Sequence, residues 1–208
     1  MRPYDAILFD FDGVLVDSEP VHYACWSEIL STFGLTLGWD AWCANCIGVS
    51  DRAMLQRMCR ELSPPIDVET LYATYPRKNA RFLELMGERM PFFDGVRELF
   101  ESLYSEYALA VVTSSGRGEV EPLLKKAGLA PYLKAAVYGG EVKRLKPAPD
   151  PYLRAAELLR AKYPLVVEDS DAGEASGRAA GFNVLRVTVP GEVPQALRNA
   201  ILRNNLDE

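Results

Sequence analysis

The stretch Ala6-Ile7-Leu8-Phe9-Asp10-Phe11-Asp12-Gly13 decides the fold. Four apolar residues run directly into two aspartates spaced two apart, and a glycine follows. A short apolar run that ends at a turn signal is typical of a strand buried on both faces of a parallel sheet. Runs of the same kind recur further along the chain, at residues 108–112, 135–138, 165–167 and 184–187.

Segments with the apolar period of a helix lie between these runs, at residues 96–104, 120–127, 151–161 and 173–180. Regular alternation of strands and helices predicts an α/β fold, a doubly wound parallel sheet of the Rossmann-like kind. Ligands bind at the carboxyl ends of the strands in such folds. Polar residues that follow each apolar run are therefore the candidates for function.

Residues 20–89 break the alternation and carry helical periodicity throughout. Trp26, Ile29, Leu30 and Phe33 are spaced three and four apart, as on the buried face of a helix. We expect an all-helical insertion at residues 18–89. The α/β core then consists of residues 1–17 and 90–208.

Composition restricts the classes of partner. The 208 residues carry a net charge of −6 and a pI near 5.0, which disfavours nucleic-acid binding because that depends on clustered Lys and Arg. No apolar run approaches the roughly 20 residues needed to cross a bilayer, and the start of the chain does not resemble a signal peptide. We expect a cytoplasmic protein that binds neither nucleic acid nor membrane, as a monomer or weak homodimer.

The four cysteines, Cys25, Cys43, Cys46 and Cys59, fall in one stretch. Cys43 and Cys46 have CxxC spacing, but a zinc site would need a second pair or several histidines, and the chain has one His. We expect all four to be buried and reduced. A role for Cys43 and Cys46 stays open.

Asp10 and Asp12 are the first candidates for chemistry. Two carboxylates at the end of a buried strand are costly unless a cation or a proton neutralises them. One could attack phosphorus while the other handles the proton of the leaving group. Taken alone, the pair fits a solvated turn better.

Polar residues at the ends of three later strands favour a functional role for this pair over a solvated turn. Thr113-Ser114-Ser115-Gly116 follows the second strand and offers hydroxyl and amide donors for a phosphate, or helix caps. Lys146, held by Pro147 in an extended backbone, follows the third. Glu168 and Asp169 follow the fourth and suit Mg²⁺, while the Asp169-Ser170 pair could also cap the next helix. The topology would bring all these groups to one edge of the sheet.

The first motif, Asp10 to Glu19, resembles that of the haloacid dehalogenase superfamily. Thr113, Lys146 and the Glu168-Asp169 pair match the other three motifs in order and spacing, over nearly the whole chain. The helical insertion resembles the cap of the β-phosphoglucomutase-like branch. The resemblance implies a Rossmann-like core with a helical cap.

The same resemblance implies roles for these residues. Asp10 would be the nucleophile and a magnesium ligand, and Asp12 the general acid/base whose carbonyl also binds the metal. Thr113, with Ser114 and Ser115, would bind the phosphoryl group, and Lys146 would neutralise its charge. Asp169 would bind Mg²⁺ with help from Glu168.

In the insertion, His22 and Lys78 match residues of the mutase cap, and both could contact substrate. The loop 48–52 resembles the specificity loop of that cap. Mutases carry an arginine directly after the serine, whereas Asp51 stands there in this chain and Arg52 follows. Arg52 is the third candidate for substrate contact in the insertion, because the acid at position 51 would repel a second phosphate unless Arg52 turns to cover it.

The leading hypothesis is a Mg²⁺-dependent phosphatase that acts on a small phosphorylated sugar or polyol through an aspartyl-phosphate. The alternative within the family is a β-phosphoglucomutase. A third hypothesis is a non-catalytic protein that binds a phosphorylated ligand, against which the acid/base Asp12 argues. A dehalogenase fits least, because its chemistry could dispense with Glu168 and Asp169.

Overall fold

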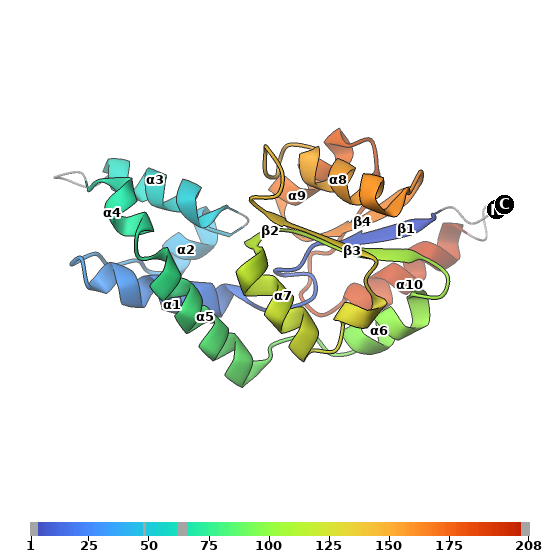
Figure 1. The fold of residues 1–208 in the computed structure, drawn as a ribbon, viewed down its shortest axis with the longest axis horizontal. Helices are drawn as coiled ribbons and strands as arrows, with labels where there is room; N and C mark the ends of the chain where they lie inside the picture. Colours follow the sequence, from blue (N-terminus) through green and yellow to red (C-terminus); the bar gives the residue numbers. More distant parts are fainter. Residues whose placement is uncertain (1–3, 48, 62–65, 205–208) are drawn as a thin grey trace. The chain divides into compact units, whose positions relative to one another are not determined.

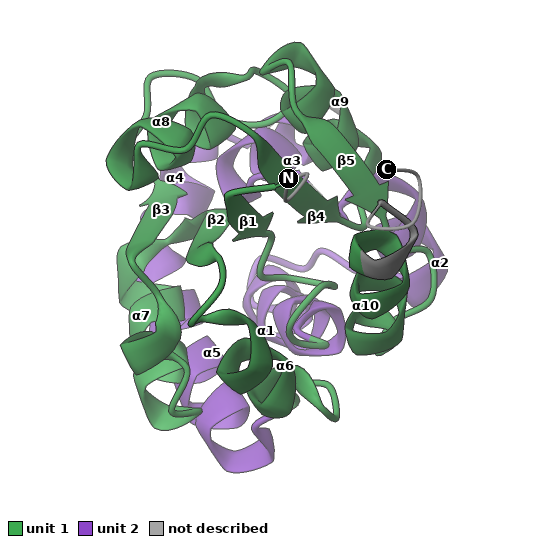
Figure 2. Cartoon of the chain, turned by 90° about the vertical axis from the view of Figure 1, so that its right-hand side faces the viewer, with its two compact units in different colours: residues 1–17, 91–208 green, residues 18–90 purple. Residues whose placement is uncertain are grey.

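A computed structural model describes residues 4–47, 49–61 and 66–204. Gly48, the first residue of the expected specificity loop, lies outside the described residues. The chain divides into two compact units (Figure 2). We call Met1–Asp17 with Pro91–Glu208 the α/β unit, and Ser18–Met90 the helical unit.

The α/β unit is built on a five-stranded sheet in the order β3-β2-β1-β4-β5 (Figure 1). All neighbouring strands pair in parallel, and β1 is central. The strands are β1 (Ala6–Phe9), β2 (Ala108–Gly116), β3 (Ala135–Gly139), β4 (Pro164–Glu168) and β5 (Asn183–Arg186). The expected doubly wound α/β fold is confirmed.

Helices cover both faces of this sheet, with α8 and α9 on one side and α6, α7 and α10 on the other (Figure 2). They are α6 (Val96–Leu103), α7 (Arg117–Lys126), α8 (Asp150–Leu159), α9 (Asp171–Ala179) and α10 (Val193–Asn204), with a 3₁₀ turn at Ala130–Tyr132. The α10 helix was not expected from the sequence.

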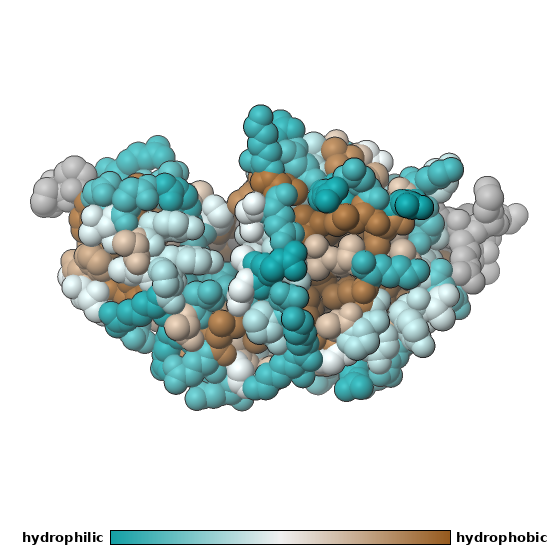
Figure 3. Space-filling model, viewed as in Figure 1, coloured by the Kyte–Doolittle hydropathy of each residue, from teal (hydrophilic) through white to brown (hydrophobic). Residues whose placement is uncertain are grey.

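The central strand is buried on both faces because its alternate side chains enter two cores. Leu8 lies in a cluster with Tyr152 and Ala155 of α8. Phe9, the next residue, stacks on Phe100 of α6 with ring centroids 4.9 Å apart. Figure 3 shows apolar residues also along the part of the sheet that lies between α7 and α8.

The second strand is longer than expected. Residues 113–116 were expected to form a turn, but β2 continues to Gly116 after a shift in its register with β3 between Val112 and Gly116. The α7 helix begins immediately afterwards, with Gly116 as its N-cap residue. An irregular strand end therefore takes the place of the expected turn.

The helical unit contains five helices among its described residues. They are α1 (Glu19–Ser31), α2 (Trp39–Asn45), α3 (Asp51–Glu61), α4 (Val68–Tyr72) and α5 (Tyr75–Arg89). Trp26, Ile29 and Leu30 of α1 share one buried cluster with Met54 and Leu55 of α3. This unit has a hydrophobic core of its own.

The cysteines differ from expectation in one respect. Cys25, Cys46 and Cys59 are buried and free, as expected. Cys43 is exposed, so the expectation that all four are buried was wrong. Cys43 lies within the short helix α2, whereas buried Cys46 is the C-cap residue that follows the end of that helix.

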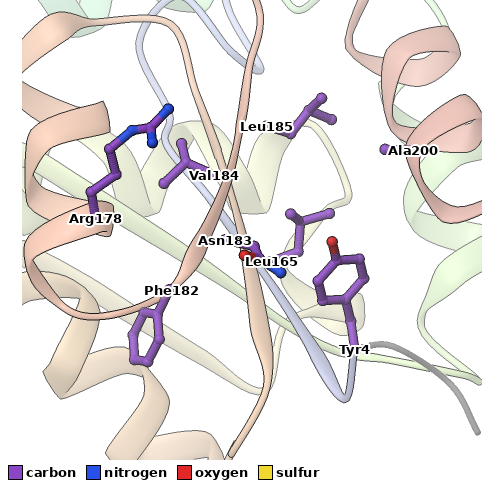
Figure 4. A pocket seen from close by; sticks show the side chains of 8 residues that line it. All are labelled: Tyr4, Leu165, Arg178, Phe182, Asn183, Val184, Leu185 and Ala200. Atoms are coloured by element: carbon purple, nitrogen blue, oxygen red, sulfur yellow. The ribbon is translucent and has the colours of Figure 1, made fainter. Parts of the chain in front are cut away.

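A pocket of about 380 Å³ opens beside β4 and β5, and its lining includes Tyr4, Leu165 and Asn183 (Figure 4). Tyr4 precedes β1, Leu165 is the second residue of β4 and Asn183 begins β5, so this part of the pocket lies toward the amino ends of the strands. Ligands of doubly wound folds bind at the opposite, carboxyl ends. The functional site is therefore expected at the carboxyl ends, away from this pocket. Within the described ranges, every helix is too short or too polar to span a bilayer.

Candidate active site

Three carboxylates meet at the carboxyl edge of the sheet. Asp10 follows β1 directly, and its amide donates to the carbonyl of Val167 in β4 over 3.0 Å. Glu168 ends β4 and Asp169 follows it. One carboxylate oxygen from each of Asp10, Glu168 and Asp169 lies within 4.8 Å of the others. Adjacent parallel strands thus bring together acids that are about 160 residues apart in sequence.

Lys146 places a cation against this acid cluster. Its ammonium lies 2.8 Å from Oδ1 of Asp10 and 2.6 Å from Oε1 of Glu168. It also donates to the carbonyl of Val112 over 2.9 Å. An ammonium has three donors, and each has an acceptor here. Because only 4% of the side chain is exposed, the charge is held in one place.

Glu168 is the most tightly held of the acids. Its Oε1 accepts hydrogen bonds from Lys146 and from the hydroxyl of Tyr152, at 2.6 and 2.7 Å. Its Oε2 accepts from the amides of Asp169 and Ser170 and from the Ser170 hydroxyl, at 3.1 to 3.2 Å. Ser170 also caps α9 through Gly173, as expected. Glu168 is fully buried, so this bonding offsets the cost of its charge.

Burial and mutual repulsion raise the proton affinity of two acids. Burial, and then the charge of Glu168, raise the pKa of Asp10 well above its ordinary value, although Lys146 opposes the shift. The same two causes raise the pKa of Asp169 to about 7. One lysine cannot compensate the three carboxylates of the cluster. The site therefore holds excess negative charge that a proton or a metal ion would neutralise.

The pKa shifts of Lys146 and Glu168 favour the charged forms of both groups. Burial alone would lower the pKa of Lys146, but the charges of Asp10 and Glu168 outweigh it and raise the pKa. Burial alone would raise the pKa of Glu168, but the charge of Lys146 and its hydrogen bonds lower it. Lys146 and Glu168 thus form a charged pair at neutral pH.

Asp12 is held by hydroxyl groups from β2. The hydroxyl of Ser115 donates to Oδ2 of Asp12 over 2.8 Å, and that of Thr113 donates to the same atom over 3.4 Å. The amide of Ser115 in turn donates to Oγ1 of Thr113 over 3.0 Å. Ser114 lies between them in β2, half-buried. The irregular end of β2 therefore orients the second aspartate of the first motif.

Two glycines make room for the acids. A Cβ at Gly13 would lie 2.0 Å from Oδ2 of Asp169, and its φ of +76° disfavours other residues. A Cβ at Gly173 would lie 1.8 Å from Oε1 of Glu168. Side chains at either position would displace an acid. The glycine after the Asp10-Phe11-Asp12 motif is thus required by the site itself.

The expected substrate residues of the insertion form a second group, inside the helical unit. The Lys78 ammonium lies 2.9 Å from Nδ1 of His22 and 2.9 Å from Oδ2 of Asp51. An ammonium carries only donors, so Nδ1 of His22 is the acceptor. His22 also stacks on Phe82 with ring centroids 4.2 Å apart. Trp26 is buried and donates from Nε1 to Asp51, which fits the expectation that it packs in the core.

Arg52 stands apart from this group. Its guanidinium forms an ion pair with Glu69 and lies over the ring of Tyr72, 4.7 Å from the centroid. Both side chains of the ion pair are well exposed, so its net stabilisation is small. Arg52 is therefore paired with an acid of the same unit, and among the described residues no second cation is shown beside it that would help to bind a phosphate.

Sequence reasoning missed two partners in these groups. Tyr152 was not singled out, because an aromatic residue on a helix is ordinarily core packing and nothing in the spacing says that its hydroxyl reaches Glu168. The pairing of Asp51 with Lys78 was also missed, since the two are 27 residues apart on separate helices. Ser115 was expected to bind substrate, and its bond to Asp12 gives it a further contact.

The residues at the sheet edge lie in a part of the chain that matches a known protein family. Residues 7–187 match the family model of haloacid dehalogenase-like hydrolases. This chain belongs to that family. The expected family and its β-phosphoglucomutase-like branch are therefore confirmed.

Similar haloacid dehalogenase-like proteins include named enzymes. The chain is 31% identical over 187 residues to the fructose-1-phosphate phosphatase of Escherichia coli (strain K12), covering 88% of this chain and 96% of that protein. It is 30% identical over 182 residues to the phosphorylated carbohydrates phosphatase of Thermotoga maritima, covering 86% and 82%. The β-phosphoglucomutase structure from Clostridium difficile has the same fold, with a TM-score of 0.82, 18% identity, and coverage of 98% and 99%.

Proposed function

We propose that this protein is a Mg²⁺-dependent phosphohydrolase that removes phosphate from a small phosphorylated sugar or polyol, with Asp10 as the covalent nucleophile. The observation that carries the proposal is the position of Asp10 at the carboxyl edge of the sheet, where its carboxylate lies 2.8 Å from the Lys146 ammonium and within 4.8 Å of an oxygen of Asp169. Relatives named as phosphatases of phosphorylated carbohydrates support this class of substrate.

In the first half of the reaction, an oxygen of Asp10 attacks phosphorus and the bond from phosphorus to the ester oxygen breaks. Asp12 donates a proton to the departing oxygen, which leaves as an alcohol. Thr113, Ser114 and Lys146 would bind the phosphoryl oxygens and offset their charge. Phosphoryl transfer depends chiefly on such positioning and charge neutralisation.

In the second half, Asp12 takes a proton from a water molecule that attacks the aspartyl-phosphate. The bond between phosphorus and Asp10 breaks, inorganic phosphate leaves, and the carboxylate of Asp10 is restored. The same residue thus serves as acid and then as base. The hydroxyls of Ser115 and Thr113 hold Asp12 in one orientation for both steps.

The residues fit a hard metal ion. Asp10, Glu168 and Asp169 supply only carboxylate oxygens, and burial together with the charge of Glu168 raises the pKa of Asp10 and Asp169. Mg²⁺ prefers oxygen ligands and is used where phosphate is bound. Asp10 and Asp169 would hold it, with the Asp12 carbonyl, and Glu168 would assist while it anchors Lys146. When bound, Mg²⁺ would neutralise charge on the transferring phosphoryl group.

A β-phosphoglucomutase remains the alternative of the same family. A mutase protects its aspartyl-phosphate from water until a sugar hydroxyl arrives, so the two activities differ in the acceptor of the phosphoryl group. Supplying β-glucose 1-phosphate with a trace of the 1,6-bisphosphate separates them. We expect free phosphate to accumulate, whereas rapid formation of glucose 6-phosphate with little free phosphate would favour the mutase.

The test of the proposed function is phosphate release from a panel of phosphorylated sugars and polyols, with Mg²⁺ and after exhaustive chelation. We expect release from at least one member of the panel, with Mg²⁺ only. A protein that binds these compounds but releases no phosphate from any of them would support the non-catalytic alternative. Full activity after chelation would contradict the role given to the metal.

A further inference from the structure

Glu168 is surrounded by more hydrogen-bond donors than its carboxylate has lone pairs. Lys146 and Tyr152 donate to Oε1. The amides of Asp169 and Ser170 and the Ser170 hydroxyl donate to Oε2. These five donors compare with about four lone-pair sites on an ionised carboxylate. While these bonds are kept, Glu168 is saturated and offers no lone pair to a metal ion.

Tyr152, the third residue of α8, brings its hydroxyl to Glu168 from inside the core. The side chain is fully buried and shares a cluster with Leu8 of β1, Val112 of β2 and Val166 of β4. Packing against three strands fixes the ring, and its hydroxyl lies 2.7 Å from Oε1 of Glu168. A phenylalanine would fill the same space without supplying a donor. The hydroxyl is therefore the part of this side chain that acts on the site.

Tyr152 also contacts the cation that Glu168 holds. The Lys146 ammonium lies 5.1 Å from the centroid of the Tyr152 ring. The ammonium and the Tyr152 hydroxyl share Oε1 of Glu168, at 2.6 and 2.7 Å. Removing Oε1 from this position breaks both bonds, and a buried polar group that loses its partner is destabilising. Tyr152 therefore raises the free energy needed to move Glu168 away from Lys146.

We propose that Tyr152 is a positioning residue that holds Glu168 on Lys146 and thereby makes the site prefer Mg²⁺ over Ca²⁺. Asp10 and Asp169 then supply the carboxylates that bind the metal directly, and Glu168 is withheld from it. Mg²⁺ binds through one or two carboxylates and keeps several waters, whereas the larger Ca²⁺ takes about six to eight oxygen ligands. A site that withholds its third carboxylate suits the smaller ion. The inference rests on the proposed function for the use of Mg²⁺, but it can be tested without turnover.

The first experiment measures the dissociation constants of Mg²⁺ and of Ca²⁺ by calorimetric titration of the metal-free, full-length protein. In Tyr152→Phe the ratio of the two constants should shift toward Ca²⁺ by about threefold or more, because Oε1 of Glu168 regains a lone pair that the ion with more ligands can use. Tyr107→Phe is the matched control. Tyr107 is also buried, but it directly precedes β2, at the amino end of the sheet. This variant should keep the wild-type ratio.

The ratio separates positioning from a general loss of structure. A merely structural effect of Tyr152→Phe would weaken the binding of both ions alike, and an unchanged ratio in this variant would overturn the proposal. If the variant is recovered in low yield, the rise of its melting temperature with each ion gives the same comparison.

The second experiment is a double-mutant cycle in metal-free urea unfolding, with Tyr152→Phe, Glu168→Gln and the double variant. The fall in the urea midpoint caused by Tyr152→Phe should be smaller in the Glu168→Gln background, since a neutral amide oxygen accepts a weaker hydrogen bond than a carboxylate does. Equal falls in the two backgrounds would show that the Tyr152 hydroxyl does not act through Glu168, and would overturn the proposal. Wild-type protein that binds Mg²⁺ but releases no phosphate from any sugar phosphate would instead defeat the proposed function, while both experiments would still decide the role of Tyr152.

Discussion

The Lys146 ammonium lies 2.8 Å from Oδ1 of Asp10, the residue whose carboxylate we propose as nucleophile. Lys146 is also the cation that makes the buried charge of Glu168 tolerable, at 2.6 Å. The same lysine thus links the catalytic charge balance to the stability of the fold. Removing it should affect both, and the two effects can be measured separately.

Lys146→Met should lower kcat by about 10²- to 10³-fold, because a charge-stabilising group at the phosphoryl oxygens is lost. It should also lower the free energy of unfolding by about 3–5 kcal/mol, since buried carboxylates lose their partner. Urea unfolding and steady-state kinetics with Mg²⁺ check the two effects. Lys125→Met removes an exposed lysine and should change the free energy of unfolding by no more than about 0.5 kcal/mol.

Ser115→Ala should slow turnover by about tenfold, because Asp12 loses the 2.8 Å hydrogen bond that orients it. The loss should be larger for substrates with poor leaving groups, which depend most on proton donation. Ser115→Thr, which keeps a hydroxyl, should restore much of the rate. Equal losses for good and poor leaving groups would show that Ser115 does not act through Asp12.

Gly13→Ala should abolish most activity, since its Cβ would lie 2.0 Å from Oδ2 of Asp169 and force that acid to move. Gly181→Ala is the matched control, because Gly181 has a similar φ of +82° and no atom within 4 Å of the added Cβ. Both variants should lose about 1–2 kcal/mol of stability to backbone strain. Only Gly13→Ala should lose affinity for Mg²⁺, measured by calorimetry.

Metal-free protein should become less stable as pH rises from about 5 to 8. Asp169, with its pKa raised to about 7, and Asp10, raised likewise, hold protons in the folded state at pH values where the unfolded chain has released them. Folded protein then binds more protons than unfolded protein, so stability is present at low pH and lost as pH rises through the folded pKa. Glu168 titrates below this window, because its pKa is lowered from 4.5.

The measurement is the melting temperature in chelator at pH 5 and pH 8. We expect a fall of several degrees, given about 2–4 °C per kcal/mol for a chain of this size. Asp169→Asn should flatten the difference, and comparison with it subtracts the contributions of other groups. Mg²⁺ should stabilise wild type more at pH 8 than at pH 5. A melting temperature that rises with pH in chelator would contradict this charge balance.

Much of the fold and of the sheet-edge cluster follows from the sequence, because both depend on local signals. Asp10, Lys146 and Asp169 each follow an apolar run, and a parallel sheet brings the ends of such runs together. Side-chain contacts between separate elements carry no such signal. The bond from Tyr152 to Glu168 and the pairing of Asp51 with Lys78 depend on side-chain direction, which spacing does not encode.

The boundaries of helices and strands also depend on contacts that the local sequence does not encode. Residues 113–116 carry the composition of a turn, but pairing of Gly116 with Gly139 extends β2 through them. Tertiary hydrogen bonding overrides local preference there. No strand follows the α10 helix among the described residues, so the strand-helix alternation that predicted its neighbours gave no reason to expect it.

Asp10→Asn should reduce turnover by about 10⁴-fold or more, because an amide cannot act as the anionic nucleophile. The swap is nearly isosteric, and it removes one carboxylate from a crowded cluster, so the protein should fold. Circular dichroism and thermal unfolding check the fold beside the kinetics. Substantial activity in folded Asp10→Asn would contradict the mechanism.

The most direct test of a covalent Asp10 is peptide mass spectrometry of enzyme quenched in acid during turnover with Mg²⁺. We predict that the peptide containing Asp10 gains the mass of one phosphoryl group, that fragmentation places it on Asp10, and that Asp10→Asn treated in the same way gains nothing. Turnover with no modified peptide, under conditions in which an added acyl-phosphate standard survives the quench, or a phosphoryl group on another residue, would contradict the account.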